Sequence, residues 1–143
     1  MDDFHRDQTV GSGVAPQTLT NVTWNTRILT ATQGVASVAT LATNQFTLAA
    51  GEYLIEASAG AVDILHKVRI QNITDGATAK FGTSESGQTS NPSRSHVSAR
   101  VVHATPKTFE LQHYVNGGSV NGGIAVSSGG SEVYATVKIT RLR

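Results

Sequence analysis

The histidines are the side chains of this sequence best suited to hold a metal ion, and their spacing argues against a shared site. His96 and His103 are seven positions apart in one predicted strand, so alternation places them on opposite faces. A zinc site needs several converging ligands, and the chain has no cysteine and no His-x-His pair. We therefore predict no metal site and no cofactor. If a threefold axis gathered one histidine from each of three chains, the best candidate among His5, His66, His96, His103 and His113 would be His113.

Serine, histidine and aspartate are also present, but their arrangement does not predict a hydrolase. No Gly-x-Ser-x-Gly sequence occurs. Ser12 and Ser86 adjoin glycines in predicted loops, and the sequence indicates no partner for them. Asp63 follows a predicted strand and Glu85 lies in a loop, so the acids do not suggest the facing pair of a glycosidase. We expect a protein that is not an enzyme.

Two polar loops are candidates for ligand binding. Residues 116–123 contain four glycines and two asparagines, but they lead into a predicted strand and lack the lysine of a phosphate-binding loop. This segment is either a flexible hairpin loop or a tip loop whose amides and hydroxyls bind sugar hydroxyls, and the same alternatives apply to residues 84–94. The candidate ligand-binding residues are Glu85, Gln88, Asn91, Arg94, Asn116, Ser119 and Asn121.

Alternating hydrophobic residues predict the strands that would position these loops. The clearest strand is 132–142, in which every second residue from Val133 to Ile139 is apolar and is expected to face the core. Asp75-Gly76 suits a hairpin turn. Turn residues at this spacing predict an antiparallel sandwich or barrel of about eight to ten strands. The other predicted strands are 23–32, 35–41, 46–48, 52–59, 66–72, 79–83, 96–104, 108–115 and 123–126.

The length and composition fit one all-β domain. The 143 residues are rich in threonine, valine and glycine, and only 15% are charged, with a net charge of +1. A nucleic-acid-binding face is normally basic, so we expect no nucleic-acid partner. No apolar run reaches the ~20 residues of a membrane span, and the N-terminus lacks the apolar segment of a secretory signal. We predict an extended arm or linker over 1–22, with at most one short strand in it, and a domain over 23–143. We also predict no membrane insertion and synthesis in the cytoplasm.

Four segments, taken in order, carry a resemblance to a known family. They read FTLAAGEYLI at 46–55, RIQNIT at 69–74, TFELQ at 108–112 and EVYATVKI at 132–139. Together they resemble the jelly-roll domain of the tumour necrosis factor and complement globular-head superfamily, in particular its versions in bacterial and bacteriophage proteins. The resemblance covers roughly 23–143 and implies an antiparallel jelly-roll β-sandwich of about ten strands that forms a homotrimer. No residue matches a catalytic motif of that family.

The resemblance also implies that the inner sheet of each protomer packs around a threefold axis. If 23–32, 52–60, 108–115 and 132–142 form this sheet, its core face carries Tyr53, Ile55, Phe109, Leu111, Val133, Val137 and Ile139. The opposite row is rich in tyrosine, which is common at interface centres, and it is either an interface or an ordinary solvated face. The predicted trimer-interface residues are Glu56, Ser58, Gln112, Tyr114, Tyr134, Thr136 and Lys138.

The function that the resemblance implies is binding without catalysis. The expected protein is a trimeric receptor-binding or adhesion head of a phage or a bacterium, which recognises a cell-surface glycan or protein through its loops. Its expected location is a virion or an extracellular surface. The alternative is a structural or decoration trimer of a viral particle without a small ligand.

Overall fold

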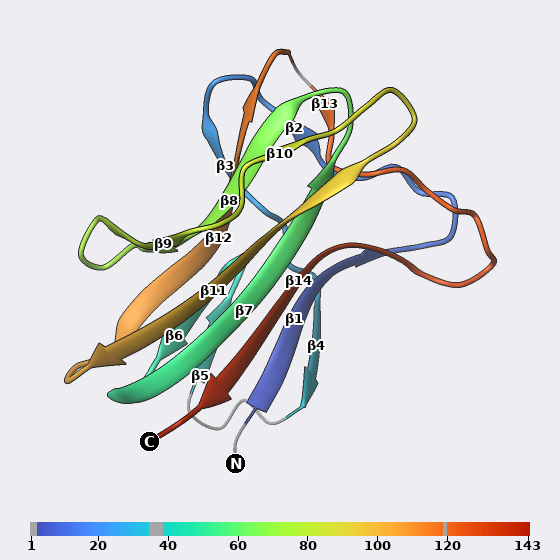
Figure 1. Ribbon diagram of the computed structural model, residues 1–143. Helices are drawn as coiled ribbons and strands as arrows, with labels where there is room; N and C mark the ends of the chain where they lie inside the picture. The colour runs from blue at the N-terminus through green and yellow to red at the C-terminus, as the bar shows by residue number, and fades with distance from the viewer. Residues whose placement is uncertain (1–2, 35–38, 119) are drawn as a thin grey trace.

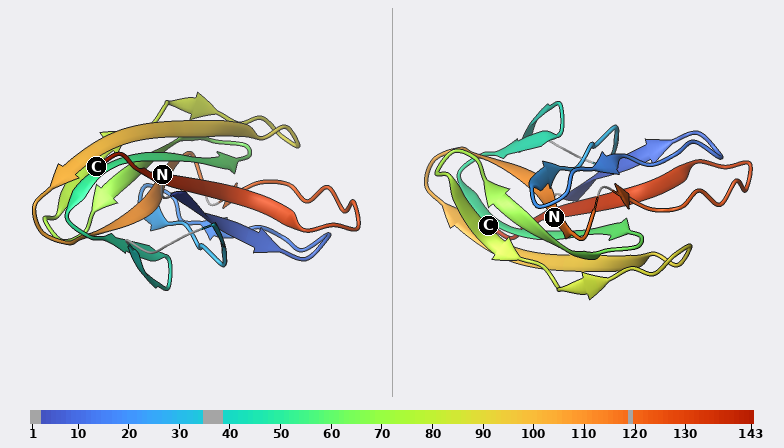
Figure 2. Two further views of the ribbon diagram at one scale, coloured as in Figure 1. Left: turned by 90° about the horizontal axis from the view of Figure 1, so that it is seen from below. Right: turned by 90° about the horizontal axis from the view of Figure 1, so that it is seen from above.

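The computed structural model describes residues 3–34, 39–118 and 120–143, which form two facing antiparallel sheets (Figures 1 and 2). The front sheet follows the order β11 (Ser93–His103), β7 (Gly51–Ala61), β14 (Glu132–Arg141), β1 (Asp3–Val10) and β4 (Ala31–Gly34). The back sheet follows the order β10 (Glu85–Ser86), β8 (Leu65–Asn72), β12 (Lys107–Asn116), β6 (Gln45–Leu48) and β5 (Ala39–Ala42). In addition, β3 (Trp24–Thr26) pairs with β12, β9 (Ala77–Phe81) pairs with β8, and β2 (Thr18–Leu19) pairs with β13 (Val120–Asn121).

This architecture confirms the predicted antiparallel jelly-roll sandwich. The described residues include no helix that could cross a membrane. The two ends of the described chain lie together at one end of the sandwich, which we call the basal end, whereas β2, β10 and β13 lie at the opposite, distal end (Figure 1).

The first strand differs from the sequence prediction. Residues 3–10 are not an arm but form β1, which lies inside the front sheet between β14 and β4. Its side chains that face the interior are Phe4, Arg6 and Gln8, with exposed fractions of 1%, 8% and 3%. Two of these three are polar, so the segment lacks the apolar alternation by which a strand is normally identified.

The core lies between the two sheets. Of the seven residues predicted for it, six are buried there: Tyr53, Ile55, Phe109, Leu111, Val137 and Ile139. A second, smaller cluster consists of Leu19, Ala61, Ile64 and Val115. Leu19 belongs to β2, which lies at the distal end.

The seventh predicted core residue, Val133, is excluded by a bulge in β14. Gln8 pairs with Ala135 and Thr9 pairs with Val133, so Tyr134 is an extra residue in the strand. The bulge turns Tyr134 inward, with 4% of its surface exposed, and leaves Val133 47% exposed. The predictions for these two residues are therefore wrong, because one inserted residue reverses the side-chain alternation on one side of the bulge.

The predicted inner sheet is also partly wrong. The sequence places strand 108–115 in the same sheet as 52–60, but β12 lies in the back sheet, so Gln112 and Tyr114 are on the outer face of that sheet. The predicted strand 23–32 is divided into β3 and β4, which belong to different sheets. Residues 123–126 are not a strand. The predicted strand 35–41 lies partly outside the described residues, and its remainder belongs to β5.

Candidate functional site

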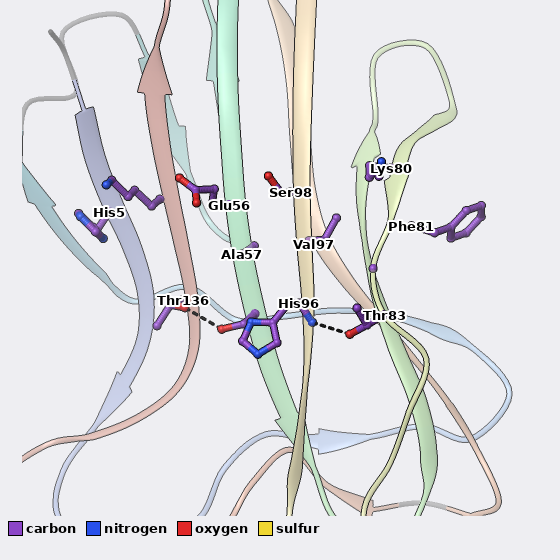
Figure 3. Close-up of a pocket in the computed structure, with 13 residues that line it drawn as sticks. His5, Glu56, Ala57, Lys80, Phe81, Thr83, His96, Val97, Ser98 and Thr136 are labelled. Atoms are coloured by element: carbon purple, nitrogen blue, oxygen red, sulfur yellow. Dashed lines mark hydrogen bonds between the residues drawn. The ribbon is translucent and has the colours of Figure 1, made fainter.

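The outer face of the front sheet carries a groove that contains part of the predicted interface (Figure 3). The groove has a volume of about 780 Å³ and extends from β1 and β14 across β7 and β11 to residues 80–83. Besides His5, Lys80 and His96, its lining includes four of the predicted interface residues, which are Glu56, Ser58, Thr136 and Lys138. The other three, Gln112, Tyr114 and Tyr134, are on the back sheet or in the interior.

A row of polar side chains crosses this face and includes one acceptor that has no partner in the described chain. Arg94 Nε donates to Ser58 Oγ at 2.8 Å, and Ser58 Oγ lies 3.0 Å from Thr136 Oγ1. Asp7 is the neighbour of Thr136 on β1. Its Oδ1 atom is buried and has no hydrogen-bond partner among the described residues, and burial raises the pKa of this carboxyl group. Buried carboxylate oxygens normally accept hydrogen bonds, so the Oδ1 atom of Asp7 lacks a donor in the described chain, although a backbone hydrogen bond with Val137 reaches the carboxyl group.

A second pocket, of about 530 Å³, lies where β8, β10 and β12 end at the distal end of the back sheet. Cross-strand pairing explains its composition, because His66 pairs with Glu85 while Lys67 pairs with Tyr114. The side chains of six polar residues in its lining make no hydrogen bond within the described parts of the chain. These residues are Lys67, Ser84, Glu85, Ser86, Tyr114 and Asn116. We call this the distal pocket.

An aromatic surface continues from the distal pocket over the outer face of the back sheet. The ring of Tyr114 lies 5.3 Å from that of Trp24, which lies 5.9 Å from the ring of Phe81. The guanidinium of Arg69 lies 4.0 Å from the Trp24 ring centre, and Lys67 Nζ lies 4.8 Å from that of Phe81. These are cation–π distances, and Phe81 remains 52% exposed.

The structure brings together only two of the predicted ligand-binding residues. Glu85 in β10 and Asn116 at the end of β12 both line the distal pocket. The remaining predicted residues lie elsewhere: Gln88 and Asn91 bridge to each other, Arg94 bonds to Ser58 on the front sheet, Asn121 is in β13, and Ser119 lies outside the described residues.

Four of the six polar residues without hydrogen bonds in the distal pocket were not among the predicted ligand-binding set. Lys67 and Tyr114 point outward from strands, and alternation could have identified that direction. Nothing in the sequence indicates that they lie beside Glu85. Ser84 and Ser86 adjoin the predicted Glu85, so loop membership alone was a signal for them.

Two histidines and an arginine form a buried chain beneath the distal pocket. Arg27 is fully buried, and its Nη1 lies 3.3 Å from His113 Nδ1. His113 Nε2 lies 2.8 Å from His66 Nδ1, and His66 Nε2 lies 2.8 Å from Ser93 Oγ. Since His113 is 0% exposed inside the protomer, it cannot reach an ion on a threefold axis. The inward direction that the alternation of strand 108–115 predicts for His113 is confirmed, and its candidacy for an axial site is excluded.

The hydrogen-bond distances that connect Ser93, His66 and His113 are like those of a catalytic triad. The protons, however, lie on the opposite nitrogens from those that a triad requires. Arg27 can only donate, so His113 Nδ1 accepts and its Nε2–H donates to His66 Nδ1. His66 Nε2 then carries a proton and donates to Ser93, whereas a general base must accept the proton of the serine. Burial and Arg27 also lower the pKa of His66 to about 4, which makes it a weak base.

Comparison with known proteins identifies the fold. No protein-family model matches the sequence, and no curated protein matches it significantly. Among solved structures, Eiger TNF from S. frugiperda aligns at 12% identity and a TM-score of 0.62 over 99% of this chain and 92% of its own. The globular domain of zebrafish complement 1qA aligns at 12% identity and 0.59, over 100% and 98%. The PRD1 vertex protein P5 aligns at 11% identity and 0.55, over 99% and 97%. The chain therefore shares the jelly-roll fold of these tumour necrosis factor and complement domains.

Proposed function

We propose that the protein is a homotrimeric binding module that recognises a cell-surface saccharide in the distal pocket and does not catalyse a reaction. The observation that carries this proposal is the convergence of six polar side chains with unused hydrogen-bonding capacity around one concave site. Binding sites typically combine such groups with aromatic surface in a pocket of this size. The reversed proton order of the Ser93 chain supports binding over hydrolysis.

The lining of the distal pocket favours a saccharide over a peptide. Hydroxyl, amide, carboxylate and ammonium groups all border it, and they match the mixed donors and acceptors of sugar hydroxyls. A peptide strand would instead add to a sheet edge or insert apolar side chains into a groove. The bordering edge strand β10 spans only two residues, and Leu65 is the one apolar side chain in the lining.

Self-association is proposed through the outer face of the front sheet. The groove there and the unpartnered Oδ1 of Asp7 support a neighbouring protomer as the missing donor. Three copies would raise the avidity of a weak saccharide site on a repetitive surface. The likeness to a viral vertex protein supports a location on a virion, from which a receptor-binding or adhesion head would meet its host.

Saccharide binding can be tested on a glycan array followed by calorimetry. Glu85→Ala and Asn116→Ala are expected to weaken binding about tenfold each, since each removes a hydrogen bond of about 1.4 kcal/mol to the ligand. Gln88→Ala is the matched control, because Gln88 is an exposed loop residue outside the distal pocket. Saccharide binding that is unaffected by both pocket variants would contradict the assignment of this site.

The oligomeric state can be tested by native mass measurement. The wild-type chain is expected to run as a trimer, and Thr136→Arg should yield monomers because it places a long charged side chain on the front-sheet face. Thr40→Arg is the control, since Thr40 is exposed on β5 of the back sheet. A monomeric wild-type protein would exclude the trimer.

The second candidate function is a structural trimer of a viral particle, favoured by the vertex-protein likeness. It predicts normal particle assembly with no saccharide bound on the array.

A further inference from the structure

The buried chain of Arg27, His113, His66 and Ser93 connects the distal end of the sandwich to its body. It lies between the main core and the small distal cluster of Leu19, Ala61, Ile64 and Val115. His66 also lines the distal pocket, and its backbone pairs with Glu85 on one side and with Val115 on the other. A change in the hydrogen bonds or the protonation state of His66 would therefore disturb the pairing of the strands that line the distal pocket.

The chain admits only one arrangement of protons. The Arg27 guanidinium donates at one end, so each histidine must be neutral to accept on Nδ1 and donate from Nε2. A proton added to His66 occupies Nδ1, and two N–H groups then face each other at a nitrogen separation of 2.8 Å. A proton added to His113 has the same effect toward Arg27.

The charges around the chain oppose protonation. Arg27 bonds to Gln8 Oε1 at 2.8 Å and to the carbonyl oxygens of Gly60, Gly122 and Tyr134 at 3.2 to 3.4 Å, so no carboxylate is among its partners in the described chain.

The other charged groups do not compensate. The positive charge of Arg94 also lowers the pKa of His113, and the negative charge of Asp7 raises the pKa of Arg94. Lys67 and Glu85, of opposite charge, share the pocket that His66 lines. A second cation in this layer would therefore be buried without a counter-ion, which is strongly unfavourable.

We propose that this buried hydrogen-bond chain makes the distal end of the sandwich acid-labile. Protonation of His66 would separate β8, β10 and β12 at their distal ends while the basal half stays folded. Acid would then dismantle the distal pocket and release its ligand, a consequence that rests on the proposed function. Burial and Arg27 lower the pKa of His66 to about 4, and burial, Arg27 and His66 lower that of His113 to about 2. An opened end restores ordinary values near 6.5 and so is favoured by acid.

Amide hydrogen exchange of the full chain, corrected for the intrinsic pH dependence, tests the proposal without any saccharide. Between pH 7 and pH 4.5 the protection of the amides of His66 and Val115 should fall roughly 50-fold or more, as expected for a histidine whose pKa rises from about 4 to about 6.5 on opening. The basal amides of Ile55 and Ile139 should change much less. An equal loss at both ends, or no loss at the distal end, would overturn the proposal.

His66→Gln is the decisive variant, because glutamine keeps one acceptor for His113 and one donor for Ser93 but does not titrate. It should reduce the acid effect at the distal end at least tenfold, whereas His96→Gln, on the exposed front-sheet groove, should leave it unchanged. An acid effect of full size in His66→Gln would overturn the proposal. If that variant does not fold, ring ¹⁵N spectra of the wild-type protein decide. At pH 6, His66 and His113 should both be neutral, with the single ring proton on Nε2. A charged ring with protons on both nitrogens at pH 6 would overturn the proposal. Failure of saccharide binding alone would leave these results unaffected.

Discussion

The hydroxyl of Tyr134 donates a hydrogen bond of 2.6 Å to the carbonyl oxygen of Val14, across a separation of 120 positions in the chain. The bulge in β14 turns the ring inward, and the bond ties β14 to the loop that follows β1. Tyr134 is thus a structural residue of the protomer, not part of an interface between protomers.

Tyr134→Phe should lower the free energy of unfolding by about 1 kcal/mol, because it leaves the ring in position and removes one hydrogen bond. Urea unfolding followed by circular dichroism measures the change. Tyr134→Arg should prevent folding, since its charge would be buried. A soluble, folded Tyr134→Arg protein that had only lost its oligomeric state would show that the side chain lies at an interface after all. Val133→Thr, at the exposed neighbouring position, is the control and should be nearly neutral.

Gly122→Ala should destabilise the protein by about 1 to 3 kcal/mol. A methyl group at this position would collide with Arg27 Nη1 and lie 2.8 Å from its Nη2, and the buried guanidinium has no room to move. Thermal unfolding provides the measurement. Gly130→Ala is the matched control in the same region, because its nearest neighbour, Ser128 Oγ, is 3.6 Å away. Equal stability of the two variants would mean that Arg27 is not held as tightly as its contacts imply.

The free energy of unfolding should fall between pH 7 and pH 5. The pKa values of His66 and His113 are lower in the folded protein than the ordinary 6.5, so the unfolded chain binds protons that the folded protein does not. The free energy of unfolding is highest above pH 6.5. It decreases as the pH falls, by about 1 to 2 kcal/mol per histidine at pH 5. Urea titrations at a series of pH values measure this loss.

The carboxylates with lowered pKa values affect the free energy of unfolding at a lower pH than the histidines do. Arg100 and Arg143 lower the pKa of Glu52, and the backbone N–H groups of Gly13, Val126 and Ser127 lower that of Glu132. Their contributions are present above the ordinary carboxyl pKa of 4.5 and disappear only as the pH falls through their lower folded values. A stability that stays constant from pH 7 to pH 5 would therefore contradict the buried histidine chain.

Trp24 should report saccharide binding by its fluorescence. It is the only tryptophan of the chain, and its ring lies 5.3 Å from that of Tyr114, which lines the distal pocket. A ligand that displaces water from this aromatic surface should shift the emission maximum in a saturable way. Asn116→Ala should weaken the titration without altering the free spectrum. A saccharide that binds by calorimetry with no spectral change would have to bind away from Tyr114.

The strands that could be predicted from the sequence are those with a regular apolar row. Tyr53 and Ile55 in β7, and Phe109 and Leu111 in β12, face the core as their alternation indicates. Alternation tells two faces apart but does not say which sheet a strand joins. That is why β12 was assigned to the wrong sheet and Tyr114 to the wrong surface.

The remaining errors come from residues that break general rules. Arginine is rarely buried, so nothing in the sequence predicts that Arg27 lies at 0% exposure or that β1 turns Arg6 inward. The bulge at Tyr134 cannot be recognised in the apolar pattern of β14, but it turns Val133 out of the core while Val137 and Ile139 remain inside it. In the distal pocket, Glu85 and Asn116 could be predicted as polar loop residues. That they line the same pocket depends on the pairing of β10 with β8, which the sequence does not indicate.

The pairing of β1 with β14 determines when the molecule can finish folding. Phe4 lies opposite Ile139, so the front sheet cannot close until nearly the whole chain is available. Contacts of such long sequence separation make folding slow. Until they form, β1 and β7 each present an open edge to which strands of other chains can add. A lower level of expression should therefore favour the native protein over aggregates, because fewer chains with open edges are present at one time to pair with one another.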